Sequence, residues 1–379
     1  MQFNCHKNLL QKAIQLTEKG TSTKSTLPIL SNLLFDLKDN KLTISSTNME
    51  ISIEKEILVN GIEDGSVLIH AKTISNIINK LPAAEVSIKV LENGTIEIKS
   101  KDINFNIHGL PPEEFPSIQK IQEGEPIVIS KDKIKELIKQ TIISVSIDES
   151  KNVLNGVLLE ISDNFIKGVS TDGFRLSFKE YEFNNQNNSN IKIIIPTKAL
   201  LELQGILSDI DSKDINLFYT SENISFVCED FYLSTRIIKG QYPEYNQVIP
   251  NESKIKLTIN KKDFTFAMER CAIIASMANT STNIIKIELV DNKLLIKAST
   301  ADVGNASEIV TVDDNINNEK VEISLNVRLI IEALKTIESE KISFMLIDSL
   351  KPVIISPIDN TTTSKFLYVI MPIRTGKKA

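Results

Sequence analysis

Apolar and polar residues alternate along the chain in a hairpin pattern that occurs three times. In the stretch 154–178, two runs with apolar residues at alternate positions flank the turn residues Ser162-Asp163-Asn164. Similar pairs of runs occupy residues 33–44 and 285–296. Each pair leads into the same dipeptide: Ser46-Thr47, Ser170-Thr171 and Ser299-Thr300. Because these dipeptides lie about 125 residues apart, the pattern indicates a repeat of whole domains and not a solenoid.

Six amphipathic stretches lie between the predicted strands. Each has apolar residues at the spacing of one helix face, as the first does at Leu10, Ala13 and Ile14. The predicted helices begin near residues 6, 72, 131, 197, 261 and 326. We therefore predict an α+β fold of three similar domains, each with two helices and antiparallel sheets. The expected domain boundaries are 1–122, 123–252 and 253–379.

Composition agrees with this picture. A chain of 379 residues with 41% hydrophobic residues is typical of a soluble globular protein with more than one core. No apolar run approaches the ~20 residues that span a bilayer. The first residues, MQFNCHKNLL, contain no apolar signal core. We therefore expect a cytoplasmic protein without a membrane partner.

The net charge of −6 argues against nucleic-acid binding by the surface as a whole. The six predicted helices are nevertheless net basic. Two explanations remain open. Lysine is a good helix former, whereas aspartate and asparagine favour turns. Alternatively, all six helices line one basic surface.

The sequence contains no recognisable catalytic or cofactor-binding motif. The dinucleotide, P-loop and zinc-protease patterns are all absent. Thr171-Asp172-Gly173 resembles a small catalytic triplet, but without a paired base it is better explained as a turn. The histidines are isolated and form no metal cluster: His6, His70 and His108. The cysteines lie in apolar runs typical of buried thiols: Cys5, Cys228 and Cys271. We predict no catalytic residue, metal or cofactor, which favours a binding or structural role.

Five segments, taken in order, resemble the bacterial sliding-clamp family, the beta subunit of DNA polymerase III. They cover nearly the whole chain: TLPILSNLL at 26–34, VLNGVLLE at 153–160, STDGFRL at 170–176, GQYPEYNQVIP at 240–250 and VIMPIR at 369–374. Each segment alone is a weak signal, but all five on a threefold repeat are specific. The resemblance implies three clamp domains per chain and two chains joined head to tail in a closed ring, with helices inside and sheets outside.

The resemblance also implies a partner-peptide pocket between the second and third domains. By matching positions it comprises Leu154, Thr171, Gly173, Phe174, Arg175, Leu176, Pro243, Val248, Leu350, Met371, Pro372, Ile373 and Arg374. Apolar walls with arginines at the rim suit an apolar peptide anchor. The chain departs from the family at Phe174, where histidine is common, and at Gln247, where arginine is common.

For DNA binding, the resemblance implies basic positions at Lys24, Lys72, Lys80, Lys151 and Lys198. Lys24 replaces an arginine and would act as a point charge. For the contact between chains, it implies Phe105 and Ile107 of one copy against Ile273 and Ile274 of the other.

Simple geometry supports two chains per ring. Helices pack about 8–10 Å apart, so six in a circle would leave a hole of roughly 10 Å. Twelve would leave a hole of roughly 28 Å, which is wide enough for duplex DNA. A basic lining would attract phosphates without reading bases, so such a ring could slide.

The implied partners are duplex DNA, a second copy of the chain, the replicative polymerase alpha subunit, the clamp loader, other DNA polymerases and mismatch-repair proteins. These proteins would bind through short apolar peptide motifs. Two rival functions remain open at this stage: a repeat-built hydrolase using Thr171 and Asp172, and a scaffold that binds only proteins. Retention on circular but not linear DNA would separate a clamp from both.

Overall fold

The computed structural model describes residues 1–22, 27–184, 190–250, 252–277, 283–315, 321–358 and 364–374. Residue contacts divide the chain into two compact units. Unit 1 comprises Met1–Asp132 with Lys198–Ile237, and unit 2 comprises Lys133–Thr197 with Ile238–Ala379. Each unit combines strands from two of the three expected domains, because two continuous sheets cross the expected boundaries.

The six predicted helices are confirmed, each beginning within one residue of the predicted start. They are α1 (Lys7–Glu18), α2 (Ala71–Lys80), α3 (Lys131–Thr141), α4 (Thr197–Leu207), α5 (Lys261–Ala275) and α6 (Val327–Thr336). Short polar side chains cap several of them. Asn260 accepts a hydrogen bond from the main chain of α5, and Asn326 does the same for α6. None of the helices in the described ranges is long and apolar enough to cross a membrane.

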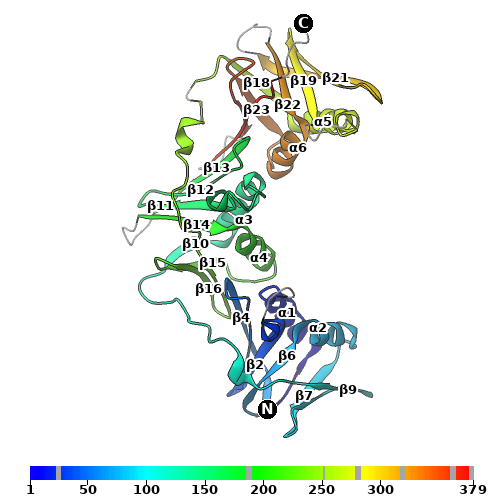
Figure 1. Cartoon of the computed structure of the whole chain (residues 1–379), viewed down its shortest axis with the longest axis vertical. Coiled ribbons are helices and arrows are strands. Elements are labelled where there is room, and N and C mark those ends of the chain that lie inside the picture. Colours follow the sequence, from blue (N-terminus) through cyan, green and yellow to red (C-terminus); the bar gives the residue numbers. More distant parts are fainter. Residues whose placement is uncertain are drawn as a thin grey trace. The chain divides into compact units, whose positions relative to one another are not determined.

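Unit 1 contains two antiparallel sheets (Figure 1). The five-stranded sheet has the order β5 (Asn60–Glu63), β1 (Gln2–His6), β7 (Glu85–Val90), β8 (Thr95–Ser100), β9 (Ile103–His108). The eight-stranded sheet has the order β10 (Ile127–Ser130), β15 (Asp214–Tyr219), β16 (Asn223–Cys228), β17 (Phe231–Arg236), β4 (Ile51–Leu58), β3 (Lys41–Thr47), β2 (Asn32–Lys38), β6 (Gly65–His70). Helices α1 and α2 pack against each other, and α1 also contacts β3 and β4.

Unit 2 contains one antiparallel array of twelve strands. Its first half is β14 (Ile191–Pro196), β11 (Gly156–Ile161), β12 (Phe165–Thr171), β13 (Arg175–Glu182), β25 (Ser364–Ile370), β24 (Val353–Ile358). Its second half is β23 (Lys341–Leu346), β18 (Ile255–Asn260), β21 (Gly304–Asn315), β20 (Lys293–Thr300), β19 (Ile284–Val290), β22 (Val321–Asn326). Helix α5 packs against α6, β20 and β21 (Figure 1).

The three predicted hairpins are confirmed as β2–β3, β11–β12 and β19–β20. In the first, Lys38 pairs with Lys41, and Asp39 and Asn40 both adopt positive φ, as a two-residue turn requires. The predicted antiparallel α+β class is therefore confirmed.

The repeated Ser-Thr dipeptide has a packing role in the first two copies. The buried Ser46 hydroxyl donates to the Thr17 carbonyl at the end of α1, and the buried Ser170 hydroxyl donates to the Thr141 carbonyl at the end of α3. Each bond ties the end of a helix to the second strand of a hairpin, and at α1 it adds to the bond that the Thr17 carbonyl already accepts from the Gly20 amide at 3.0 Å. In the third copy Ser299 is exposed, so the sequence is repeated there without the contact.

Candidate functional site

The segment Thr171–Arg175 is a tight turn between β12 and β13. The Thr171 hydroxyl donates to the Arg175 carbonyl at 2.6 Å and accepts from the Gly173 amide at 3.1 Å. The Asp172 carboxylate accepts from the amides of Phe174 and Arg175 at 2.8 and 3.0 Å. Gly173 has φ +95°, which favours glycine. Both candidate catalytic groups thus hold the turn, in agreement with the predicted structural role.

The chain's last described segment lies beside this turn. Strand β13 pairs with β25, Arg175 opposite Ile370, and the Met371 amide donates to the Phe174 carbonyl at 2.9 Å. The Ile373 amide donates to the Ser324 carbonyl at 2.8 Å. Segments almost 200 residues apart in sequence are therefore neighbours, as the predicted pocket requires.

Four of the predicted pocket residues are exposed apolar side chains, and we call them the apolar rim: Phe174, Val248, Leu350 and Met371. Phe174 is 67% exposed. Thr171, Leu154, Pro372 and Ile373 are half-buried, whereas Gly173, Pro243 and Arg374 are exposed. Phe174 and Met371, which the main-chain bond at the junction brings together, expose apolar surface of the kind typical of interaction sites.

Leu176 differs from the expectation that it forms a wall. It is only 2% exposed and belongs to a buried cluster with Phe178, Val369 and Tyr242, against which Leu154 packs. Leu176 pairs with Val369, and residues paired across two strands lie on the same face of the sheet. The Leu176 side chain therefore faces the buried cluster and supports the exposed residues of the apolar rim.

Arg175 is held by groups that the sequence did not reveal. Its Nε donates to the Asp172 carboxylate at 3.0 Å, and its Nη1 contacts Glu332 of α6 and the Tyr368 hydroxyl. Burial opposes the positive charge, but Tyr368 and Glu332 outweigh it and raise the pKa of Arg175. Glu332 and Tyr368 are distant in sequence, so only the paired strands bring them here.

Four of the five predicted DNA-contacting lysines are exposed. Lys72 and Lys80 lie on α2, Lys198 lies near the start of α4, and Lys151 precedes a short 3-10 helix, Asn152–Leu154. None makes an ion pair with another described residue. Lys24 lies outside the described residues.

One further lysine was missed by the sequence interpretation. Lys19 lies at the end of α1, with its Nζ close to Gly205 of α4. Burial raises the pKa of Glu202 on α4, while Lys19 and Lys198 both act to lower it. These two lysines therefore add positive potential at the same place.

The residues predicted to join two chains lie on an edge strand and on a helix. Phe105 is exposed on the edge strand β9, where Ile107 is half-buried against the core. Ile273 is 58% exposed near the end of α5, and Ile274 is half-buried beside it. Apolar side chains on an unpaired edge favour pairing with another chain.

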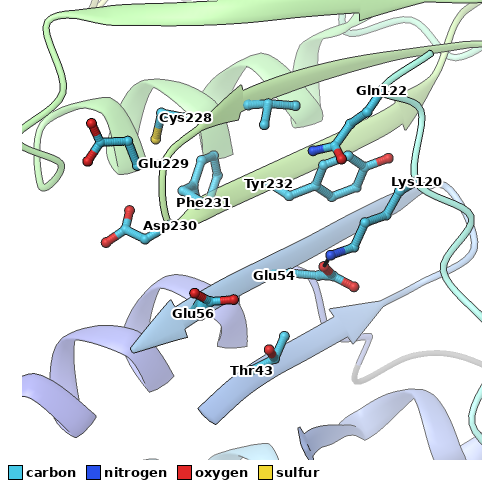
Figure 2. Close-up of a pocket in the computed structure, with 11 residues that line it drawn as sticks. Thr43, Glu54, Glu56, Lys120, Gln122, Cys228, Glu229, Asp230, Phe231 and Tyr232 are labelled. Carbon is cyan, nitrogen blue, oxygen red and sulfur yellow. Dashed lines mark ion pairs between the residues drawn. The ribbon is translucent and has the colours of Figure 1, made fainter. Parts of the chain in front are cut away.

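Two cavities lie apart from all these residues, in unit 1 along β4 and β17. One has a volume of about 100 Å³ and is lined by Glu54, Lys120 and Tyr232 among others (Figure 2). The other has a volume of about 350 Å³ and is lined by the Thr47–Glu50 turn and Arg236. None of the predicted site residues lines either cavity.

Comparison with known proteins agrees with this geometry. Sequence models of the DNA polymerase III beta subunit match the N-terminal domain at residues 1–119, the central domain at 128–244 and the C-terminal domain at 246–374. The beta sliding clamp of Staphylococcus epidermidis is 30% identical, over 99% of this chain and 100% of that protein. That of Streptococcus pneumoniae R6 is 28% identical, over 99% of each.

Solved structures give the same result. The beta subunit of Streptococcus pyogenes superposes with a TM-score of 0.93 at 26% identity, and the Bacillus subtilis sliding clamp with 0.92 at 27%. Each comparison covers 99% of this chain and 100% of the solved chain. The predicted three-domain organisation is therefore confirmed, and the chain belongs to the bacterial beta sliding clamp family, the non-catalytic processivity subunit of DNA polymerase III.

Proposed function

We propose that two copies of this chain form a closed ring that encircles duplex DNA in the cytoplasm. The ring slides without sequence preference and tethers the replicative polymerase, the clamp loader, other DNA polymerases and mismatch-repair proteins. The observation that carries this proposal is the match of the whole chain, from end to end, to solved sliding clamps. Three clamp domains supply six helices, and the geometry of helix packing requires about twelve around a duplex.

The free strand edges support a head-to-tail dimer. Among the strands of the described residues, β9 pairs only with β8. Strand β21 pairs with β20 from Gly304 to Thr311, whereas β18 covers its other side only from Val312 to Asn315. Each copy thus offers two edges to another copy, and Phe105 and Ile107 would meet Ile273 and Ile274 beside them. If β9 of each copy pairs with β21 of the other, two identical contacts form. These two contacts close a ring with the two-fold symmetry of a dimer.

The exposed lysines support binding to the DNA backbone. Lys72, Lys80, Lys151 and Lys198 can approach phosphates without breaking an ion pair within the described chain. Such contacts carry no sequence information, which is what sliding requires.

The apolar rim supports binding of partner tails. Phe174, Val248, Leu350 and Met371 would cover an apolar peptide anchor, while the buried cluster under Leu176 keeps the surface in place. The domain boundaries at residues 122 and 252 remain part of the proposal. They set which segments form the junction between the second and third domains.

One experiment tests the ring. The protein is loaded onto a nicked circular plasmid by a clamp loader and passed through a gel-filtration column. We expect it to stay with the circle and to leave after the plasmid is cut once. Equal retention on linear DNA would indicate ordinary surface binding, and no retention on either form would support a scaffold or an enzyme instead.

A further inference from the structure

The junction of β4 with β17 in unit 1 repeats the geometry of the junction of β13 with β25 in unit 2. Just beyond the paired strands, the Arg236 amide donates to the Glu50 carbonyl at 3.0 Å, as the Met371 amide donates to that of Phe174 at 2.9 Å. The turns also correspond. The Met49 amide donates to the Thr47 hydroxyl at 3.1 Å, which is the bond that Gly173 makes with Thr171. Met49 has φ 74°, in the same region as the glycine.

The connecting segments correspond as well. After β9, the sequence Gly-x-x-Pro-Glu at 109–113 overlaps a short 3-10 helix, Pro112–Glu114. After β17, Gly-x-x-Pro-Glu at 240–244 leads into the 3-10 helix Tyr245–Gln247. The first junction therefore shares these backbone features with the second. It also has the cavity of about 350 Å³, which none of the predicted site residues lines.

The side chains at corresponding positions differ in a consistent way. Ser52 pairs with Ser234 at the positions where Leu176 pairs with Val369 in the other junction. Two hydroxyl side chains therefore replace a buried apolar pair. At the rim, Glu50 stands in the place of Phe174 and Arg236 in the place of Met371. Met49, Ile118 and Ile121 also line the cavity, but the hydroxyls and charges at the paired strands suit polar and charged groups of a ligand.

Several of these polar groups are available to a ligand. Arg236 is exposed, and its side chain has no ion pair within the part of the chain that the structure describes. The Ser234 hydroxyl lines the cavity without a hydrogen-bond partner among the described residues. The Ser52 hydroxyl donates to Thr47 at 2.9 Å, which leaves its oxygen free to accept.

Residues 116–121 form a linker that lines the cavity. Its C-terminal end is held by hydrogen bonds, whereas main-chain groups at its N-terminal end have none among the described residues. The Ile121 amide donates to the Tyr232 hydroxyl at 3.0 Å, that hydroxyl donates to the Gln119 carbonyl at 3.3 Å, and Ser225 donates to the Ile121 carbonyl at 2.6 Å. Figure 2 shows the neighbouring Lys120 and Gln122 extending over Glu54 and Tyr232 on the other cavity. Within the described chain, residues 116–118 make no main-chain hydrogen bond of their own. A peptide can pair with such an unoccupied backbone.

We propose that the cavity between the Thr47–Glu50 turn, Arg236 and the linker is a second peptide-binding site, which takes an extended polar segment of a partner protein with an acidic side chain for Arg236. A free anion fits less well, because Glu50 and Arg236 both line the cavity and the negative charge of Glu50 opposes binding of an anion. A peptide can place a carboxylate at Arg236 and a cation at Glu50. Residues i and i+2 of an extended chain share one face, so this needs an acid and a base two residues apart.

The test uses the full-length protein and the pentapeptide acetyl-Gly-Asp-Ser-Lys-Gly-amide. Methyl NMR signals of Met49, Ile118 and Ile121, which line the cavity, report binding. We expect saturable shifts of these methyls, and about tenfold weaker binding of the Asn/Gln version of the peptide, since it loses charge-assisted hydrogen bonds. Arg236→Gln should weaken binding of the charged peptide about tenfold in the same way.

The matched control is Lys213→Gln, which removes one exposed charge elsewhere in unit 1 and should leave binding unchanged. Inorganic phosphate is the control ligand. Three outcomes overturn the proposal: no shift of the three methyls at saturating peptide, equal binding to Arg236→Gln, or equal shifts with phosphate alone. Shifts confined to Met371 would assign the peptide to the apolar rim and also reject the second site.

Discussion

Removing the exposed apolar side chains of the rim tests the proposed partner pocket most directly. A phenylalanine side chain buries about 200 Å² when covered, and Phe174 is 67% exposed, so a bound peptide can cover about 130 Å² of it. At about 25 cal/mol per Å² this is an upper limit of about 3 kcal/mol. Part of this gain is lost in ordering the peptide, so Phe174→Ala should weaken binding about 10- to 100-fold.

The same substitution should hardly affect folding. An exposed side chain outside a core changes stability by within about 0.5 kcal/mol. Leu176 gives the opposite case, because it is 2% exposed in the cluster with Val369. An aspartate there would bury a carboxylate among apolar groups and cost several kcal/mol, so Leu176→Asp would test folding and not the pocket.

Fluorescence anisotropy with a labelled tail peptide of the replicative polymerase provides the measurement, and thermal unfolding provides the folding control. Ile147→Ala is the matched variant, since Ile147 is 97% exposed in the same unit and lies outside the rim. The pocket is refuted if Phe174→Ala binds the peptide as tightly as the unaltered protein. It is also refuted if Ile147→Ala weakens binding equally, because the effect would then be non-specific.

Three further predictions concern DNA, assembly and folding. Changing Lys72 and Lys198 to Glu should weaken retention on circular DNA and flatten its salt dependence, with an unchanged melting temperature. Unaltered retention would mean that these lysines are only solvent-exposed helix residues and contact no DNA. Changing Ile273 and Ile274 to Lys should give folded monomers by light scattering, because paired edges would bury unpaired charge; a persistent dimer would place the contact elsewhere. Ser170→Ala should lower the free energy of unfolding by about 1–3 kcal/mol, since the carbonyl at the end of α3 loses its buried partner; an unchanged denaturant midpoint would contradict that role.

The sequence predicted the helices and hairpins closely because local periodicity determines them. The stripe that contains Leu10, Ala13 and Ile14 is fully buried in α1, and the turn residues Asp39 and Asn40 adopt the positive φ that their chemistry favours. These features depend on residues only a few positions apart. Periodicity can therefore assign them without knowledge of the rest of the chain.

Features of the site that depend on distant pairing could not be predicted in this way. Leu176 is opposite Val369 and Arg175 is beside Tyr368, in pairs separated by almost 200 residues. Alternation within β13 shows that successive residues face opposite sides of the sheet. It does not show which distant strand pairs with β13 or which face becomes buried. For the same reason the sequence did not reveal Glu332 at Arg175, or Lys19 beside α4.

The internal repeat makes the two junctions comparable, and their difference carries information about function. If the junctions served only to join domains, the Leu176–Val369 pair would be as suitable between β4 and β17 as between β13 and β25. The chain instead has Ser52 and Ser234 there, together with Glu50 and Arg236 at the rim. Hydroxyls at such a junction contribute less to stability than the apolar pair they replace. The backbone features that the two junctions share therefore set their place in the fold, whereas four side chains at each junction determine what it can bind.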